Sequence, residues 1–197
     1  MSKFKKLVLA VAVLAMTVTG LTGCGGSGGT SGSADQLKIG VTSFADTLEP
    51  TEQYFSWVVM RYGVGETLVK FDDEMGVEPW LAENWELSSD NLTWTFKIRD
   101  GVKFSNGTEM TADLVKASLE RTYDMSKRAR SDFFQYDSMT ADGSNLVIKT
   151  KTPTPGLPGC LADPLFLIVD TTVDTDTFAT DGPICTGPYA VNSFDKE

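Results

Sequence analysis

The side chains that most often carry out enzyme chemistry are scarce in this sequence. Histidine is absent, and cysteine occurs three times, as Cys24, Cys160 and Cys185. Histidine is the commonest general base and a frequent ligand of transition metals. Without it, a cysteine thiol lacks the usual partner that would activate it as a nucleophile. The composition therefore argues against an enzyme and favours a protein that acts by binding.

Cys160 and Cys185 allow two interpretations. They flank an apolar run, Leu165–Val169, and each lies in a segment rich in proline and glycine. If the chain is exported, its surroundings permit oxidation. A disulfide between them would close a loop of about 25 residues and stabilise the fold by roughly 3 kcal/mol. The alternative is a pair of free thiols.

Two acidic clusters could suggest a calcium site, because calcium prefers carboxylate oxygens. They are Asp72–Glu74 and Asp170–Asp176. Neither has the ligand spacing of an EF-hand loop, so charged faces exposed to solvent are the better interpretation. No pair of carboxylates stands out for glycoside hydrolysis. We therefore predict no metal site, no cofactor and no catalytic residue.

The first 35 residues have the features of an export signal and a tether. Lysines at positions 3, 5 and 6 precede an apolar stretch, Leu7–Val18, which is short for a membrane-spanning helix. Leu21–Cys24 (LTGC) looks like a bacterial lipobox, which predicts a signal peptide over 1–23 and a lipid on Cys24. A coincidental cysteine after an ordinary signal peptide is the alternative. The glycine- and serine-rich remainder of 24–35 predicts a flexible tether.

Overall composition limits the class of partner. The net charge is −10 at pH 7, which argues against nucleic acid, since an acidic surface cannot replace the counterions of a phosphate backbone. The 41% apolar and 22% charged residues are typical of globular proteins, and 197 residues suffice for one or two domains.

The stretch Pro79–Tyr123 gives the clearest structural signals. Leu92, Trp94, Phe96 and Ile98 alternate with polar residues, which predicts a strand with one buried face. Asn106-Gly107 indicates a tight reversal. Thr111 is a candidate N-cap, with Asp113 in the first turn of a helix that follows. We interpret this stretch as scaffold.

Regular elements are also expected on both sides of that stretch. Strands are predicted at Leu37–Val41, Leu68–Phe71, Leu165–Val169 and Tyr189–Phe194. A helix is predicted from Thr51 to about Thr67, and one or two helical turns within Asp174–Thr180. We also expect a mobile basic loop at Met125–Ser131 and a hairpin over Met139–Lys151 that turns at Asp142-Gly143.

Taken in order, these segments resemble the extracellular solute-binding proteins of ABC importers, specifically the oligopeptide/dipeptide/nickel-binding family, family 5. The matching motifs are Leu48-Glu49-Pro50, Glu66-Thr67-Leu68, Pro79-Trp80-Leu81-Ala82 with Trp85, Trp94–Arg99, Val102–Phe104, Asn106-Gly107, Ala112–Val115 and Thr186–Tyr189. Three positions depart from the family pattern: Glu49 replaces Asp, Asn91 replaces Gly, and Cys185 replaces Gly.

The resemblance implies an α/β fold with α+β elements, of the periplasmic-binding-protein-like type II, cluster C. Family chains are more than twice this long and bind ligand between two lobes that close by a hinge motion. Residues 36–197 would then be the N-terminal part of the domain: a partial first lobe with its inserted subdomain, without the second lobe and the C-terminal return.

The resemblance also implies partners and contacts. The solute would be a peptide or a small solute such as a nickel complex, captured by a monomer that is lipid-anchored at the outer face of the cytoplasmic membrane and delivered to ABC permease subunits. The family places groove residues at positions that correspond here to Glu52, Tyr54, Phe55, Ser131, Phe133 and Phe134. Ordinary packing is the alternative, and it is favoured for Phe55. A secreted lipoprotein enzyme or an adhesin with the same fold is the alternative function.

Overall fold

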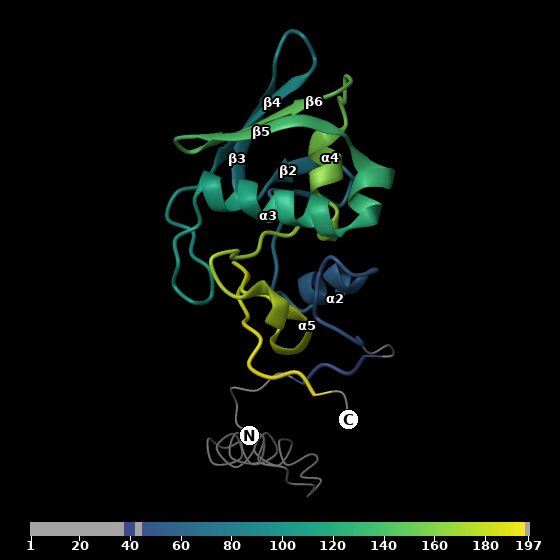
Figure 1. The fold of residues 1–197 in the computed structure, drawn as a ribbon, viewed down its shortest axis with the longest axis vertical. Coiled ribbons are helices and arrows are strands. Elements are labelled where there is room, and N and C mark those ends of the chain that lie inside the picture. Colours follow the sequence, from purple (N-terminus) through teal and green to yellow (C-terminus); the bar gives the residue numbers. More distant parts are fainter. Residues whose placement is uncertain (1–37, 42–44, 196–197) are drawn as a thin grey trace, which may run out of the picture. The chain divides into compact units, whose positions relative to one another are not determined.

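The computed structural model describes residues 38–41 and 45–195, and the elements of the second range are shown in Figure 1. The α-helices are α2 (Phe55–Arg61), α3 (Ala112–Met125), α4 (Leu157–Leu161) and α5 (Phe178–Asp181). The strands are β1 (Val69–Phe71), β2 (Val77–Pro79), β3 (Ala82–Leu87), β4 (Thr93–Ile98), β5 (Tyr136–Asp142) and β6 (Asn145–Thr150). A π-helix, η1 (Ala129–Phe133), and two 3₁₀ helices, η2 (Pro164–Phe166) and η3 (Thr175–Thr177), complete the set.

A four-stranded antiparallel sheet with the order β3-β4-β6-β5 forms the upper part of the ribbon in Figure 1. Trp94, Phe96 and Ile98 of β4 are buried, as their alternation predicted. The hairpin β5–β6 is confirmed, but its turn is Gly143-Ser144, one residue later than predicted, with Gly143 at a φ of +59°. Helix α3 packs against β5 and β6 and closes the main hydrophobic core.

Helix α3 begins where the sequence predicted. The Thr111 side chain accepts a hydrogen bond from the Leu114 N–H at 3.3 Å, and Asp113 lies in the first turn, where a negative charge is favoured. At the other end, Arg130 donates to the carbonyl oxygens of Tyr123 and Asp124. The last turn of α3 is thus closed by a side chain from the loop predicted to be mobile.

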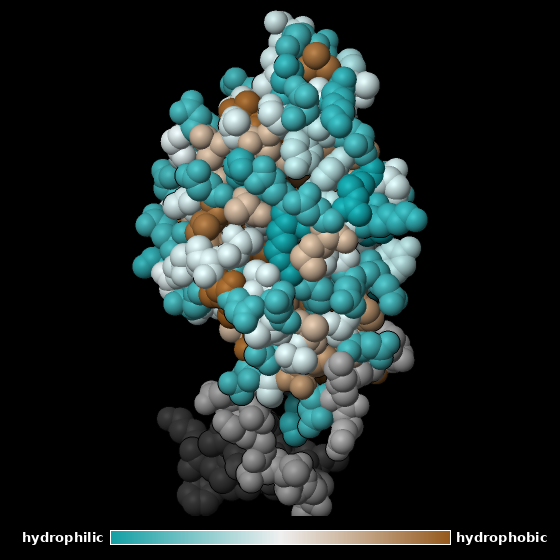
Figure 2. All heavy atoms as spheres, viewed as in Figure 1, coloured by the Kyte–Doolittle hydropathy of each residue, from teal (hydrophilic) through white to brown (hydrophobic). Residues whose placement is uncertain are grey.

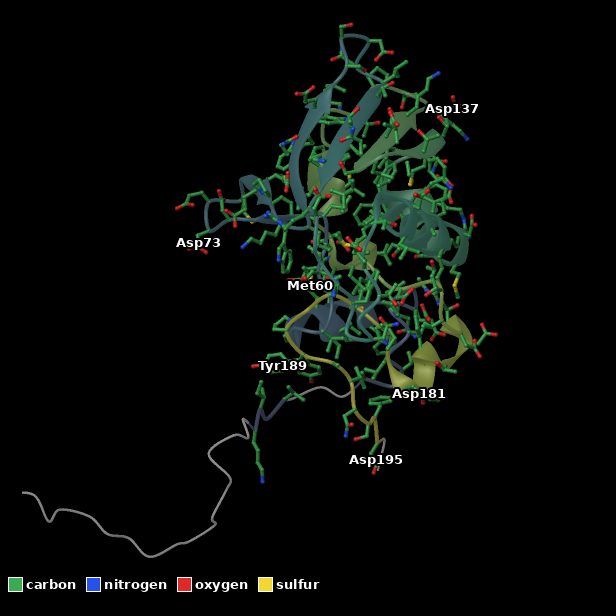
Figure 3. The ribbon with its side chains drawn as sticks, turned by 90° about the vertical axis from the view of Figure 1, so that its left-hand side faces the viewer. Met60, Asp73, Asp137, Asp181, Tyr189 and Asp195 are labelled. Carbon is green, nitrogen blue, oxygen red and sulfur yellow. The ribbon has the colours of Figure 1, made fainter. Side chains whose placement is uncertain are left out.

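Strands β1 and β2 form a separate two-stranded hairpin. Figure 3 shows Asp73 at its tip, projecting to the left of the ribbon. The turn is held by Asp72, whose carboxylate accepts the Glu74 N–H at 3.0 Å and the Gly76 N–H at 2.6 Å. The first acidic cluster is therefore a solvent-exposed turn.

A second, smaller hydrophobic cluster lies between α2 and α5. Its buried members are Val59, Val64, Leu167, Val169, Phe178 and Cys185. Gly187 joins this cluster to the end of α2, since its N–H bonds to the Val64 carbonyl at 3.0 Å. A Cβ at Gly187 would lie 2.3 Å from the Gly63 carbonyl oxygen, so this close backbone approach requires glycine.

Four of the predicted elements differ from the structure. The helix expected over Thr51–Thr67 spans only Phe55–Arg61, because Gly63 adopts a φ of +72° and ends it. The strand expected at Leu165–Val169 begins as the 3₁₀ turn η2, which Asp163 caps. Within Leu37–Val41, the described residues 38–41 contain no strand, and no strand is assigned to Tyr189–Phe194.

The basic loop also differs from its prediction. Residues 129–133 form the π-helix η1, with Ala129 fully buried. The Ala129 N–H donates to the Ser126 hydroxyl at 3.3 Å. This segment is therefore an ordered connection between α3 and β5.

The predicted disulfide is absent, and both cysteines are free thiols. Cys160 lies in α4 and packs on the main core. Cys185 is buried in the second cluster, and its backbone forms an isolated antiparallel β-bridge with Val169. The two side chains thus belong to different clusters, which corrects the prediction in favour of its alternative. Cys24, with the predicted signal peptide and tether, lies outside the described residues.

Candidate functional site

One arginine connects two segments that the sequence analysis predicted to face the ligand. The Arg128 Cζ atom lies 5.1 Å from the ring centroid of Tyr54 and 5.0 Å from that of Phe133. Both distances are within the range of cation–π contacts. The guanidinium also pairs with Asp163, with Nη2–Oδ2 at 3.1 Å and Nη1–Oδ1 at 3.5 Å. We call these four residues the Arg128 cluster.

Each member of the Arg128 cluster is held by a different local structure. Phe133 ends η1 and packs edge-on against Phe166, at 5.0 Å between ring centroids. Asp163 caps η2 by accepting the Leu165 N–H at 2.9 Å. Tyr54 follows Gln53, whose φ of +47° lies in the left-handed region. The cluster is thus assembled from segments far apart in sequence.

The Arg128 cluster combines a polar centre with an exposed aromatic surface. The Arg128 and Asp163 side chains are 25% and 16% exposed, whereas Tyr54 is 66% exposed. A guanidinium carries five N–H donors, and the contact with Asp163 uses only part of them. The arrangement can therefore donate to a carboxylate or carbonyl oxygen of a solute while Tyr54 packs against its apolar part.

Comparisons with known proteins identify the family of this chain. Residues 76–197 match the model for bacterial extracellular solute-binding proteins, family 5. The chain belongs to family 5. A crystal structure of the nickel ABC transporter protein from Bacillus halodurans superposes on it with a TM-score of 0.70 at 40% identity, over 76% of this chain and 30% of that one. The periplasmic-binding-protein-like fold is confirmed.

Two curated relatives of this family 5 chain differ in the solute that they are named for. The nickel-binding protein NikA of Staphylococcus aureus is 34% identical over 145 residues, which are 72% of this chain and 28% of NikA. The glutathione-binding protein GsiB of Shigella flexneri is 31% identical over 171 residues, 83% of this chain and 33% of GsiB. The chain thus spans about a third or less of the length of these relatives.

The six predicted contact residues of this family 5 chain lie in different environments. Tyr54 and Phe133 meet at Arg128, as described. Phe134 is 4% exposed and packs against Tyr123 and Phe166, so it serves the core. Glu52 and Ser131 are exposed, and Ser131 donates to Asp132 at 2.5 Å. Phe55 is half-buried at the start of α2.

Sequence reasoning missed Arg128 and Asp163. Arg128 was part of a run of three basic residues in a loop, and nothing in that run distinguishes it from Arg130. The structure gives them different roles, since Arg130 closes α3 and Arg128 lies between aromatic rings. Arginines shortly before the adjacent Phe133 and Phe134 marked the segment, but the sequence could not show which of them lies between aromatic rings. Asp163, the partner of Arg128, is distant in sequence.

The surroundings of both free thiols favour the protonated, unreactive form. Burial, followed by the negative charge of Asp163, raises the pKa of Cys160, and burial and Glu66 raise the pKa of Cys185. A protonated thiol is a poor nucleophile and a poor metal ligand. The described residues contain no group of three acidic, cysteine or histidine side chains placed to hold a metal ion.

Among the described residues there is likewise no helix with the length and apolarity needed to cross a membrane.

Proposed function

We propose that this chain supplies one wall of the solute site in a lipid-anchored binding protein of an ABC importer. The Arg128 cluster carries the proposal, because it joins the two segments where family 5 places groove residues. Its exposed Tyr54 ring and its guanidinium suit a small solute with both apolar and anionic groups.

The relatives narrow the class of solute that we propose. One is named for nickel and another for glutathione, a small peptide. This chain contributes no histidine, and its two remaining thiols have raised pKa values. We therefore propose that these residues contact nickel only through the carboxylates of an organic complex, which the Arg128 guanidinium can recognise. Such a complex and a short peptide both present a carboxylate that the Arg128 guanidinium can bind.

Titration calorimetry tests this proposal, with nickel–L-histidine complex, glutathione and nickel chloride as probes. We expect the complex or glutathione to bind at roughly 0.1–1 mM, because the match covers a third or less of these relatives, and nickel chloride to bind more weakly than the complex. No binding of either organic probe at millimolar concentration would contradict the solute site. Tight binding of nickel chloride would contradict the role given to the complex.

The membrane anchor rests on the lipobox and the tether. We propose that the chain is exported, cleaved before Cys24 and lipidated on that residue, which would hold the folded body close to a permease in the membrane. In bacteria that express the protein, a Cys24→Ser variant is expected to leave the membrane fraction and to lose labelling by a fatty-acid analogue. Retention of the label would sink this proposal.

A further inference from the structure

A buried ion pair links the loop before α2 to the middle of α3. Arg121 of α3 donates to both oxygens of Glu49, with Nη1–Oε1 at 3.1 Å and Nη2–Oε2 at 2.8 Å. The two side chains are only 11% and 5% exposed. The Arg121 Cζ atom also lies 5.1 Å from the ring centroid of Phe178 in α5.

We propose that the Glu49–Arg121 pair positions Tyr54 against Arg128, and so sets the geometry of the solute site. This inference rests on the proposed function only for its consequence in binding. The positioning itself is a property of the folded chain.

The first argument is the continuous set of hydrogen bonds from Glu49 to Tyr54. The Glu49 carboxylate accepts the Thr51 N–H at 3.0 Å and the Thr51 hydroxyl at 2.5 Å. The Glu52 N–H bonds to the Glu49 carbonyl at 3.2 Å, and the Phe55 N–H bonds to the Glu52 carbonyl at 3.1 Å. Tyr54 lies inside the second of these turns, so the Glu49 carboxylate anchors the segment that presents the ring.

The second argument is the backbone of Gln53. Its φ of +47° places a non-glycine residue in the left-handed region, where L side chains are sterically disfavoured. Such a conformation persists where the surroundings hold it at both ends. Here Arg121 holds the Glu49 end, and Arg128 contacts the Tyr54 end. Both arginines belong to α3 and the loop that follows it.

The third argument is energetic. A buried ion pair is weak evidence for stability, because removing two charges from water offsets most of their attraction. The Nε atom of Arg121 is buried without a hydrogen-bond partner, which adds to that cost. The ion pair is therefore better explained by the conformation that it specifies for the segment from Glu49 to Tyr54 than by a gain in stability.

The direct test is ¹⁹F NMR of protein labelled with 3-fluorotyrosine. The Tyr54 resonance is assigned by its loss in Tyr54→Phe, and Arg128→Met gives its position without the stacked guanidinium. We expect Glu49→Gln to move the Tyr54 resonance toward the Arg128→Met position. Glu49→Asp should leave the resonance closer to its original position, because it keeps the negative charge that pairs with Arg121. A simple loss of packing would not be rescued by the shorter acid.

A matched control lies on the same helix. Glu120, one residue before Arg121, forms a half-buried ion pair with Lys116 at 2.6 Å. Glu120→Gln should leave the Tyr54 resonance unchanged. If Glu49→Gln fails to fold, the double variant Glu49→Gln/Arg121→Met leaves no buried charge unpaired and takes its place. An unmoved Tyr54 resonance in whichever of these variants folds would overturn the proposal.

Binding gives a second measurement with a distinct outcome. Loss of the Tyr54–Arg128 contact should weaken binding of the nickel–L-histidine complex or glutathione about fivefold in Glu49→Gln, and much less in Glu49→Asp. If the unmodified protein binds neither probe, the proposed function fails while the NMR result still decides the positioning. If the resonance moves but affinity does not change, Tyr54 is positioned without serving the solute.

Discussion

Asn106 and Asp170 show how a motif identified in the sequence acquires a second role in the structure. Asn106-Gly107 was interpreted as a tight reversal, and Gly107 has a φ of +90°. The Asn106 side chain also donates to the fully buried Asp170 carboxylate at 2.8 Å. Thr172 donates to the same carboxylate through its N–H and its hydroxyl, at 2.9 and 2.6 Å. The turn is thus fixed to the segment after η2.

These contacts predict a dependence of stability on pH. Burial would raise the pKa of Asp170, but hydrogen bonds from Thr172, Asn106 and Thr108 together lower it. A folded-state pKa below the unfolded value means that this stabilisation is complete above about pH 4 and is lost as the pH falls through the folded pKa. In urea unfolding, Asp170→Asn should flatten the decline in stability between pH 5 and pH 2, relative to the unmodified protein.

Asn106 itself can be tested at neutral pH. Asn106→Ala should lower the free energy of unfolding by about 2 kcal/mol, because it leaves a buried carboxylate without one donor. Asn84→Ala, at an exposed position of β3, is the control and should change it by less than about 0.5 kcal/mol. Equal effects of the two substitutions would show that the contact with Asp170 contributes little.

At the scale of elements, the sequence was most informative where local patterns decide the structure. The alternation in β4, the Thr111 cap and the hairpin reversal depend on neighbours within a few residues, and all three are observed, the reversal one residue later than predicted. Leu165–Val169 was interpreted wrongly because an apolar run fits a buried strand and a buried turn equally. The Arg128 cluster depends on distant residues, which no local pattern reveals.

The junction of α2 with Thr186–Tyr189 depends on a contact that is visible only in the fold. Gly187→Ala should cost about 3 kcal/mol, because its Cβ would lie 2.3 Å from one backbone oxygen and 2.5 Å from another. Gly156→Ala is the control, since a Cβ there meets nothing within 4 Å and its φ is −86°. Thermal unfolding of both variants measures the difference, and a stable Gly187→Ala protein would contradict the close approach.

At the scale of the whole molecule, the negative net charge makes a local positive group such as Arg128 important for binding an anionic solute. The chain carries a net charge of −10, which opposes the approach of an anionic solute. Figure 2 shows that the face seen in Figure 1 is mainly hydrophilic, with hydrophobic residues in small separate groups. A local arginine flanked by aromatic rings is therefore the feature that would select such a solute. The matched regions cover only 28% and 33% of the two relatives, so most of their sequence has no counterpart in this match.

The account depends most on Arg128, and one comparison tests it directly. The affinity for nickel–L-histidine complex and for glutathione is measured by calorimetry in Arg128→Met and in Lys127→Met, which removes the same charge from the neighbouring exposed position. We expect Arg128→Met to weaken binding of the probe that the unmodified protein binds by about tenfold or more, and Lys127→Met to change it less than about twofold. Equal affinities in the two variants would contradict a solute site at the Arg128 cluster.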